Sequence, residues 1–521
     1  MPGLLRSTIA NWSAFIAAAG VSFFLSPFIV HRLGDSAYGL WALLGSLVGY
    51  LGLLDFGVRG AVTRFVAGFH ASSDHHGAAS AVRAALRVFT FLATLAIIVA
   101  AAIALTLEHL FNIPPTLLAE ARVVVLLGGV TMAAAFVGGV FSGVVAGIHR
   151  FDLDSGVEIA MTVLRAAAVV VALEAGQGLV ALGVIQLAVS VLRGAIAFAL
   201  VGRLYPELRL RGTRTTRDLV RRLLSFSLFS SLIQFSGILI YYTDSLVIGA
   251  ILPIGLVTYY TIAASLTEYA RQLVSAMSRI VTPRAGALQA AHGDAAAAAA
   301  ILRIGAAATV VTVPIAMTFL LRGESFIELW MGPEYAPRAT PVLIVLAVTV
   351  WLYGGRAIAA AGLMGLNRHR GLAAAVGVEA AANLGLSLAL IGPLGLPGVA
   401  LGTTIPSVVV TVGFLPWYFK RHLGVGVWQF VTRVWLIPSA ACLAFGLATY
   451  ALERWLGAES LLTYFAQVAV LLPLVVLGAG FLVFSKEDRA AARNRLTALL
   501  ASLSRVLPPR ALSHGKPRSP G

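Results

Sequence analysis

The chain has 521 residues, of which 59% are apolar and only 12% are charged, and its mean hydropathy is +0.90. A soluble protein of this length needs far more charge to cover its surface, so the composition excludes an ordinary soluble domain and indicates a membrane protein. The net charge of +16 would suggest nucleic acid in a soluble protein, but here it falls mostly between apolar runs, so we expect no nucleic-acid partner.

Continuous apolar runs, each close to the ~20 residues that a bilayer requires, predict about fourteen transmembrane helices. The runs cover residues 8–31, 37–57, 83–106, 120–147, 155–174, 178–202, 222–246, 255–282, 299–321, 337–364, 370–392, 397–419, 430–452 and 461–484. The runs do not alternate polar and apolar residues, so the spans are helices, and the fold class expected is an all-α integral membrane protein.

Basic residues are divided unevenly between the two sides that these spans create. If the amino terminus is cytoplasmic, 29 arginines and lysines lie between the spans or near span ends on the cytoplasmic side, and five lie on the other side. The five are Arg32, Arg122, Arg322, Arg338 and Arg454. This excess follows the positive-inside rule and predicts that both termini are cytoplasmic.

Three short segments recur in the same order about 220 residues later. GIHR at 147–150 is echoed by GLNR at 365–368, GVE at 156–158 by GVE at 377–379, and VALG at 180–183 by VALG at 399–402. The matches indicate a duplicated six-span unit whose copies share one orientation, related by an axis along the membrane normal, although chance similarity is an alternative in so apolar a chain.

The repeat suggests how the chain is divided. We expect a first lobe of six spans over 1–203, a basic cytoplasmic linker over 204–221, a second lobe of six spans over 222–420, and two additional C-terminal spans over 421–485. Residues 486–521 are expected to form a basic amphipathic helix on the cytoplasmic leaflet, or a solvated helical tail, followed by a disordered end.

Six charged residues lie within the expected spans and away from the span ends, where charge is costly and commonly functional. They are Arg165, Arg193, Glu268, Arg271, Arg356 and Glu379. Four arginines against two carboxylates make the interior net cationic. Because an arginine does not lose its proton, each one needs a carboxylate, a hydrated cavity or an anionic ligand.

Several of these charges have alternative partners. Glu268 and Arg271 lie three residues apart on one helix face, where they either pair or direct Arg271 toward a cavity. Arg356 and Glu379 either pair across adjacent spans or act separately. Arg165 and Arg193 have no obvious carboxylate partner in their own helices, which makes them candidate ligands of an anion such as phosphate; snorkelling or pairing with a distant helix are the alternatives.

Three further charges lie near span ends. Arg59 and Arg64, at the cytoplasmic edge of the second span, either recruit an anionic substrate or serve as ordinary anchors. Asp244, near the outer end of the seventh span, is either a cation site or an interfacial residue. No nucleotide-binding loop, zinc-protease motif or nucleophilic-serine motif occurs in the sequence, so we expect transport rather than catalysis, without catalytic residues, cofactor or metal.

The chain resembles the polysaccharide (O-antigen type) flippases of the multidrug/oligosaccharidyl-lipid/polysaccharide exporter superfamily. The residues that carry the resemblance are LGDSAYGLW at 33–41, LLDFG at 53–57 with Arg64, GIHRF at 147–151, and the stretch 365–404, which contains Asn367, Arg368, Asn383, Ser387 and GLPGVALGT at 395–403. The resemblance covers most of the chain.

The resemblance implies two six-helix lobes around a central cavity and two additional helices, in a multi-pass protein of the bacterial inner membrane. It also implies transfer of an undecaprenyl-diphosphate-linked oligosaccharide from the cytoplasmic to the periplasmic leaflet by alternating access, alongside membrane lipids and polysaccharide polymerase partners. The cationic role would fall to Arg59, Arg64, Arg165, Arg193, Arg271 and Arg356. Coupling to sodium or protons would fall to Glu268, Glu379 and Asp244.

Two other functions are compatible with a polytopic chain. A multidrug/cation antiporter of the same superfamily predicts an acidic or aromatic cavity and twelve spans, whereas this interior is net cationic and two more spans are present. A membrane-embedded polysaccharide polymerase or ligase predicts a large external loop, whereas the longest external segments, 107–119 and 322–336, are short.

Overall fold

The computed structural model describes residues 2–55, 58–210, 220, 242–484 and 489–490. All regular structure in these ranges is helical, which confirms the expected all-α class. The first half contains α1 (Pro2–Leu33), α2 (Asp35–Leu51), the 3₁₀ helix η1 (Gly52–Asp55), α3 (Val58–Ala71), α4 (His75–Leu110), α5 (Pro115–Gly147), α6 (Phe151–Glu174) and α7 (Leu179–Leu204).

The second half begins with a short apolar helix, Tyr242–Ile251. It continues with α9 (Leu256–Met331), α10 (Ala336–Gly365), α11 (Arg370–Leu394), α12 (Leu396–Val408), the π-helix η2 (Val409–Phe414), α13 (Leu415–Leu423), α14 (Val427–Val431), the π-helix η3 (Thr432–Leu436), α15 (Ile437–Ala441), α16 (Leu443–Leu456) and α17 (Leu461–Leu482).

The helices are those of a multi-pass membrane protein. Within the part of the chain that the structure describes, ten helices are long and apolar enough to cross a membrane. The number is eleven if the bent pair Val427–Ala441 and Leu443–Leu456 forms one span. The figure of ten counts α9 once, although α9 turns back on itself. The expected total of fourteen stays a prediction, since most of the run 222–246 lies outside the described ranges, as do the linker at 211–219 and most of the tail.

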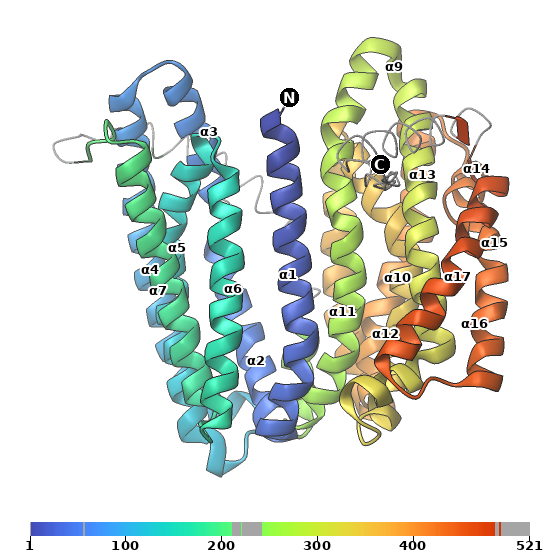
Figure 1. The fold of residues 1–521 in the computed structure, drawn as a ribbon, viewed down its shortest axis with the longest axis horizontal. Coiled ribbons are helices and arrows are strands. Elements are labelled where there is room, and N and C mark those ends of the chain that lie inside the picture. Colours follow the sequence, from blue (N-terminus) through green and yellow to red (C-terminus); the bar gives the residue numbers. More distant parts are fainter. Residues whose placement is uncertain (1, 56–57, 211–219, 221–241, 485–488, 491–521) are drawn as a thin grey trace, which may run out of the picture.

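Helix α9 contains two breaks. At Gly293 the backbone adopts φ 79°, a conformation that suits glycine, and the chain reverses there so that α9 forms two arms (Figure 1). These arms contain the expected spans at 255–282 and 299–321. A second break lies at Arg322, with φ −135° and ψ 16°, yet the helix continues to Met331.

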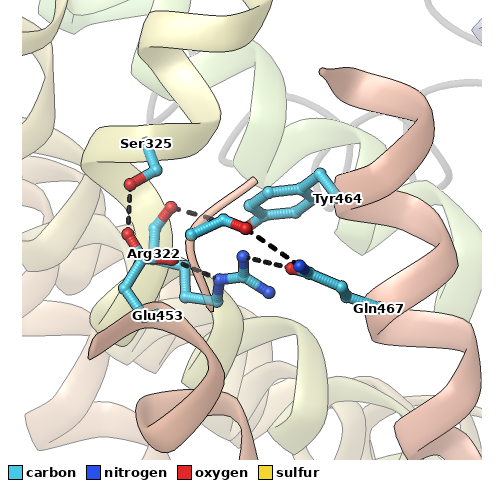
Figure 2. A network of polar contacts seen from close by, with 6 residues as sticks. Arg322, Ser325, Glu453, Tyr464 and Gln467 are labelled. Carbon is cyan, nitrogen blue, oxygen red and sulfur yellow. Dashed lines mark hydrogen bonds and ion pairs between the residues drawn. The ribbon is translucent and has the colours of Figure 1, made fainter. Parts of the chain in front are cut away.

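The loop expected at 322–336 is therefore wrong for residues 322–331, which are helical, and Arg322 is buried at 1% exposure. Its expected position on the external side stays a prediction. Its guanidinium donates to Glu453 of α16 at 2.6 Å and to Gln467 of α17 at 2.7 Å, and lies 4.5 Å from the ring centroid of Tyr464. Ser325 also donates to Glu453 (Figure 2). A carboxylate, an amide and an aromatic ring compensate the buried charge, and they fasten the last two spans to α9.

The structure separates into two helical bundles. Helices α4–α7 lie on one side and α9–α17 on the other, with α1 between them (Figure 1). At one end a shared core combines residues of both bundles, and Asp35 of α2 accepts hydrogen bonds from Tyr259 at 2.6 Å and Tyr335 at 3.0 Å. We call this the Asp35 end. Toward the opposite end, which carries Gly293, each bundle has its own core, so the bundles are joined at the Asp35 end.

The internal repeat is visible in two matching turns. His149, after α5, and Asn367, after α10, have φ values of 62° and 55°. The next residue in each turn, Arg150 or Arg368, donates its backbone N–H to the carbonyl five residues earlier, at 3.1 and 2.8 Å. Both are Schellman turns, in which a left-handed residue ends a helix. The echoed sequences therefore build the same local structure.

The same two turns also have matching neighbours. A Cβ placed on Gly147 would lie 3.1 Å from the carbonyl oxygen of Thr63, and one on Gly365 would lie 2.1 Å from that of Thr282. Thr63 and Thr282 are separated by the same interval of about 220 residues as the sequence matches. Small residues permit this close helix contact in both copies, which supports duplication over chance similarity.

Candidate functional site

A cavity of about 540 Å³ lies within the first bundle, between α2, α5, α6 and α7. Its polar lining consists of Thr131, Ser142, Glu158, Thr162, Arg165, Gln186, Ser190 and Arg193. The remaining wall is mostly aliphatic and aromatic, with Trp41 on α2 and Phe136 on α5. A mostly apolar cavity with a few convergent polar groups is the usual form of a small-ligand site.

Glycines create the space. Helices α5 and α7 approach so closely that a Cβ on Gly138 would lie 2.8 Å from the Cα of Gly194. Gly128 and Gly139 also line the cavity from α5, and neither offers a side chain to fill it. The glycine-rich sequence of α5 thus allows close helix packing at one point and leaves a hollow beside it.

The cavity contains two arginines and one carboxylate. The guanidinium of Arg193 on α7 lies 2.5 Å from a carboxylate oxygen of Glu158 on α6. Arg165, on the same helix as Glu158, forms no hydrogen bond or ion pair with any residue that the structure describes. Because Glu158 balances one of the two arginines, the lining carries one net positive charge.

The structure thus brings together the two residues singled out as anion ligands, Arg165 and Arg193. Arg193 pairs with a carboxylate of another helix, as one alternative proposed, but that helix is the adjacent α6. Sequence reasoning missed the role of Glu158, although it precedes Arg165 by seven residues and such spacing places both on one helix face. The cavity described here lies inside one bundle, whereas the central cavity expected between the lobes stays a prediction.

Arg356 and Glu379 form a closed ion pair in the second bundle. Two guanidinium nitrogens of Arg356 bind the two carboxylate oxygens of Glu379 at 2.8 and 2.6 Å. Arg356 also donates to Ser407 at 2.9 Å and to Thr411 at 3.3 Å. Pairing across adjacent spans, one of the two alternatives, is what the structure contains. Glu379 is 3% exposed, so this pair offers little to a ligand.

Glu268 and Arg271 interact with other residues rather than with each other. Glu268 accepts a hydrogen bond from Gln272 at 2.9 Å, and the guanidinium of Arg271 lies 4.8 Å from the ring centroid of Tyr353 on α10. Within the described part of the chain no ion pair joins the two. Neither residue lines the cavity of the first bundle.

Asp244, on the helix Tyr242–Ile251, belongs to a buried polar cluster. One carboxylate oxygen accepts hydrogen bonds from Tyr260 and, at 2.8 Å, from Thr403, and Asn383 donates to Thr403 at 2.7 Å. The other oxygen of Asp244 and the side-chain oxygen of Asn383 are buried without a donor among the described residues. The cluster therefore contains oxygen ligands with unused acceptor capacity, and Asp244 is buried at 4% exposure.

Arg59 and Arg64, near the second span, were the two arginines expected either to recruit an anionic substrate or to serve as anchors. Arg64 is exposed on α3, a helix over 58–71 that the sequence interpretation left as an inner segment between spans. The side chain of Arg59 lies outside the described set. Arg64 does not line the cavity of the first bundle.

A multi-pass all-helical protein of two bundles with a charged cavity inside one of them has the architecture of a membrane transporter. The sequence comparison is more specific. Residues 4–289, more than half of the chain, match the family model described as "Polysaccharide biosynthesis protein", and the chain belongs to this family.

One curated protein and two solved structures are similar to most of this chain. The uncharacterized membrane protein EpsK of Bacillus subtilis (strain 168) is 21% identical over 429 residues, covering 80% of this chain and 83% of that protein. The structure of the lipid II flippase MurJ in an inward closed conformation matches with a TM-score of 0.70 and 12% identity, over 91% of this chain and 98% of that one.

A second solved structure extends the comparison to the wider superfamily. An inward-facing multidrug resistance MATE family transporter of the MOP superfamily matches with a TM-score of 0.64 and 18% identity, over 80% of this chain and 98% of that one. At these identities the likeness concerns the fold, which is shared by transporters of quite different substrates.

Proposed function

We propose that this protein is a flippase that moves an undecaprenyl-diphosphate-linked oligosaccharide from the cytoplasmic to the periplasmic leaflet of the bacterial inner membrane, for polysaccharide biosynthesis. The observation that carries the proposal is the cavity of the first bundle, in which Arg165 has no partner among the described residues beside the Arg193–Glu158 ion pair. Membership of a polysaccharide biosynthesis family supports a glycan as cargo, and the MurJ-like fold supports a lipid carrier.

The charge of the cavity suits a diphosphate. Arginine binds phosphate oxygens through two parallel N–H donors, and a guanidinium within a membrane protein that has no carboxylate partner is costly until an anion arrives. The hydroxyl and amide groups of Thr162, Gln186 and Ser190 line the same cavity and would hydrogen-bond to phosphate or sugar oxygens. In this proposal the lipid tail remains in or beside the bilayer.

The arrangement of the two bundles suits alternating access. The excess of arginine around Gly293 and in the other inner segments favours a cytoplasmic position for that end, with both termini there. The bundles are joined at the opposite, Asp35 end, so the conformation would be closed toward the periplasm. A substrate would then enter from the cytoplasmic leaflet and leave after the Asp35 end opens, where a polymerase would use it.

The decisive experiment is reconstitution into vesicles with a fluorescent undecaprenyl-diphosphate oligosaccharide in the inner leaflet. We expect protein-dependent transfer of this lipid, and much slower transfer of a neutral glycolipid with the same tail, because only the diphosphate engages Arg165. No transfer under any sodium or proton gradient would refute the proposal.

We further propose that Asp244 binds the coupling cation. Oxygen atoms of Asp244 and Asn383 that lack donors among the described residues are the ligands that a hard cation such as sodium prefers; a proton on Asp244 is the alternative. Transport that rises with sodium concentration in wild type but not in Asp244→Asn would support a sodium site. A response to proton gradients alone would favour protonation, and independence from both would exclude coupling here.

The fold shared with a MATE transporter leaves one second candidate, a multidrug/cation antiporter. The net positive charge of the first-bundle cavity disfavours cationic drugs, since like charges repel in a site of low dielectric. Export of an organic cation such as ethidium by the same vesicles, without transfer of the lipid-linked sugar, would select this candidate.

A further inference from the structure

A smaller cavity of about 310 Å³ lies in the second bundle, between α9, η3, α15 and the end of α17. Helices α15 and α17 are on the side of the molecule away from α4–α7 (Figure 1), so this cavity is separate from the one that contains Arg165. Its lining combines the aliphatic side chains of Leu302, Ile437 and Leu482 with two arginines, Arg303 and Arg433. We call it the Arg303–Arg433 cavity.

The two arginines come from different parts of the chain. Arg303 lies on the second arm of α9, ten residues after the reversal at Gly293, and Arg433 lies in the π-helix η3 at the start of the bent thirteenth span. A π-helical turn is uncommon and occurs often at binding sites. Both residues are exposed, so they are accessible from outside the bundle.

Among the described residues, no carboxylate lines the Arg303–Arg433 cavity. Arg433 forms no hydrogen bond or ion pair with any residue in the described ranges. The other end of the same helices is different: there Arg322 of α9 meets Glu453 of α16 and is closed off (Figure 2). At the Asp35 end Glu453 thus supplies the anion that joins α9 to the last two spans, whereas toward the Gly293 end Arg433 has no partner among the described residues.

We propose that the Arg303–Arg433 cavity binds the phosphate of an anionic membrane phospholipid, whose acyl chain lies along Leu302, Ile437 and Leu482. Basic pockets between membrane helices near the bilayer surface are typical sites for anionic lipid headgroups, and arginine forks match phosphate oxygens. The aliphatic wall favours a phosphate that carries a hydrocarbon chain over free phosphate. The bound lipid joins α9, η3 and α17, and it is not the transported substrate.

Native mass spectrometry of the purified full-length protein tests this inference. The probes are phosphatidylglycerol, phosphatidylcholine and inorganic phosphate, each added to delipidated protein. We expect retention of phosphatidylglycerol in preference to phosphatidylcholine, and no displacement by millimolar phosphate. Affinity should fall about fivefold in Arg433→Gln and about thirtyfold in the double variant Arg303→Gln/Arg433→Gln, from the electrostatic contribution of one cationic side chain near a lipid surface.

Two further variants make the result specific. Arg433→Lys, which keeps the charge, should retain most of the binding, and Arg370→Gln, an exposed arginine at the amino end of α11 outside this cavity, should bind as wild type does. Unchanged phosphatidylglycerol binding in Arg433→Gln would overturn the inference, and displacement by inorganic phosphate would overturn its lipid component. Neither outcome bears on the flipping assay, so the two proposals fail independently.

Discussion

Glu158 of α6 and Glu379 of α11 occupy matching places in the two copies of the repeat, and each forms an ion pair with an arginine of a neighbouring helix. The partner is Arg193 of α7 in the first bundle and Arg356 of α10 in the second. Glu379 is 3% exposed, whereas the side chain of Glu158 is 42% exposed. The two copies therefore share an acidic position in different surroundings. The Arg356–Glu379 pair is largely buried, whereas the Arg193–Glu158 pair borders a cavity.

Replacing Arg165 tests the anion site directly. We expect Arg165→Gln to lower the rate of lipid-linked sugar transfer by about ten- to a hundredfold, because one charge-assisted contact to phosphate is lost. The assay is transfer in reconstituted vesicles. Arg122→Gln is the matched control, since Arg122 pairs with Glu108 away from the cavity. Equal loss in both variants, or none in Arg165→Gln, would remove Arg165 from the site.

A double-mutant cycle measures the pair that borders the cavity. Glu158→Gln and Arg193→Gln should each destabilise the protein, and the double variant should recover part of the loss, with a coupling of about 1 kcal/mol. Unfolding in detergent supplies the free energies. The exposed pair Glu108–Arg122, at 3.0 Å, should couple by no more than about 0.5 kcal/mol. Equal coupling in the two cycles would mean that the cavity gives Arg193 no special environment.

Breaking the Arg322 network should loosen the last two spans. Arg322→Ala leaves Glu453 without its cation, and we expect a loss of about 3 kcal/mol, the lower end for a broken buried pair because Glu453 is partly exposed. Thermal unfolding in detergent is the measurement. Arg454→Ala, which removes the exposed neighbour of Glu453, should change little. A wild-type transition temperature in Arg322→Ala would show that the network is not required for stability.

The turn of α9 should stabilise the protein in a pH-dependent way. Hydrogen bonds from Gln289 and Arg368 hold the pKa of Asp294 below its ordinary value of 3.8, and Arg368 lies 2.7 Å from it. A lowered folded-state pKa contributes stability that is present above the unfolded-state value and is lost as the pH falls through the folded-state one. The stability difference between wild type and Asp294→Asn should be constant from pH 5 to 8 and begin to decline below about pH 4, the ordinary pKa of an aspartate. A difference that does not decline as the pH falls below 4 would contradict this.

The contacts of Asp35 should hold the bundles together. Asp35→Ala removes the acceptor shared by Tyr259 and Tyr335, so we expect a larger mean distance between spin labels at Gln177 and Glu459, which are exposed on the two bundles at this end. Electron–electron double resonance gives the distances. In the control Glu174→Ala, which breaks an ion pair with Arg32 outside this contact, the distribution should match wild type.

Much of the architecture follows from local sequence. In hydrocarbon the backbone must satisfy its own hydrogen bonds, so an apolar run of sufficient length becomes a helix whatever its neighbours are. For this reason the apolar runs predict the described helices α4–α7, α10, α11 and α17 to within a few residues, apart from the amino end of α4. The helix over 58–71 was missed because it is not a long apolar run.

The identity of the embedded charges was also readable from the chain, but their partners were not. Arg322 and Glu453 are 131 residues apart, and no local pattern relates an external position to a distant acid. Whether a guanidinium is compensated depends on which helix faces it, and packing alone decides this. The sequence by itself therefore determined a multi-pass helical membrane protein, and it predicted a duplication and a net cationic interior. Only the tertiary structure decided that Arg193 and Arg356 have carboxylate partners, whereas Arg165 lines a cavity without one among the described residues.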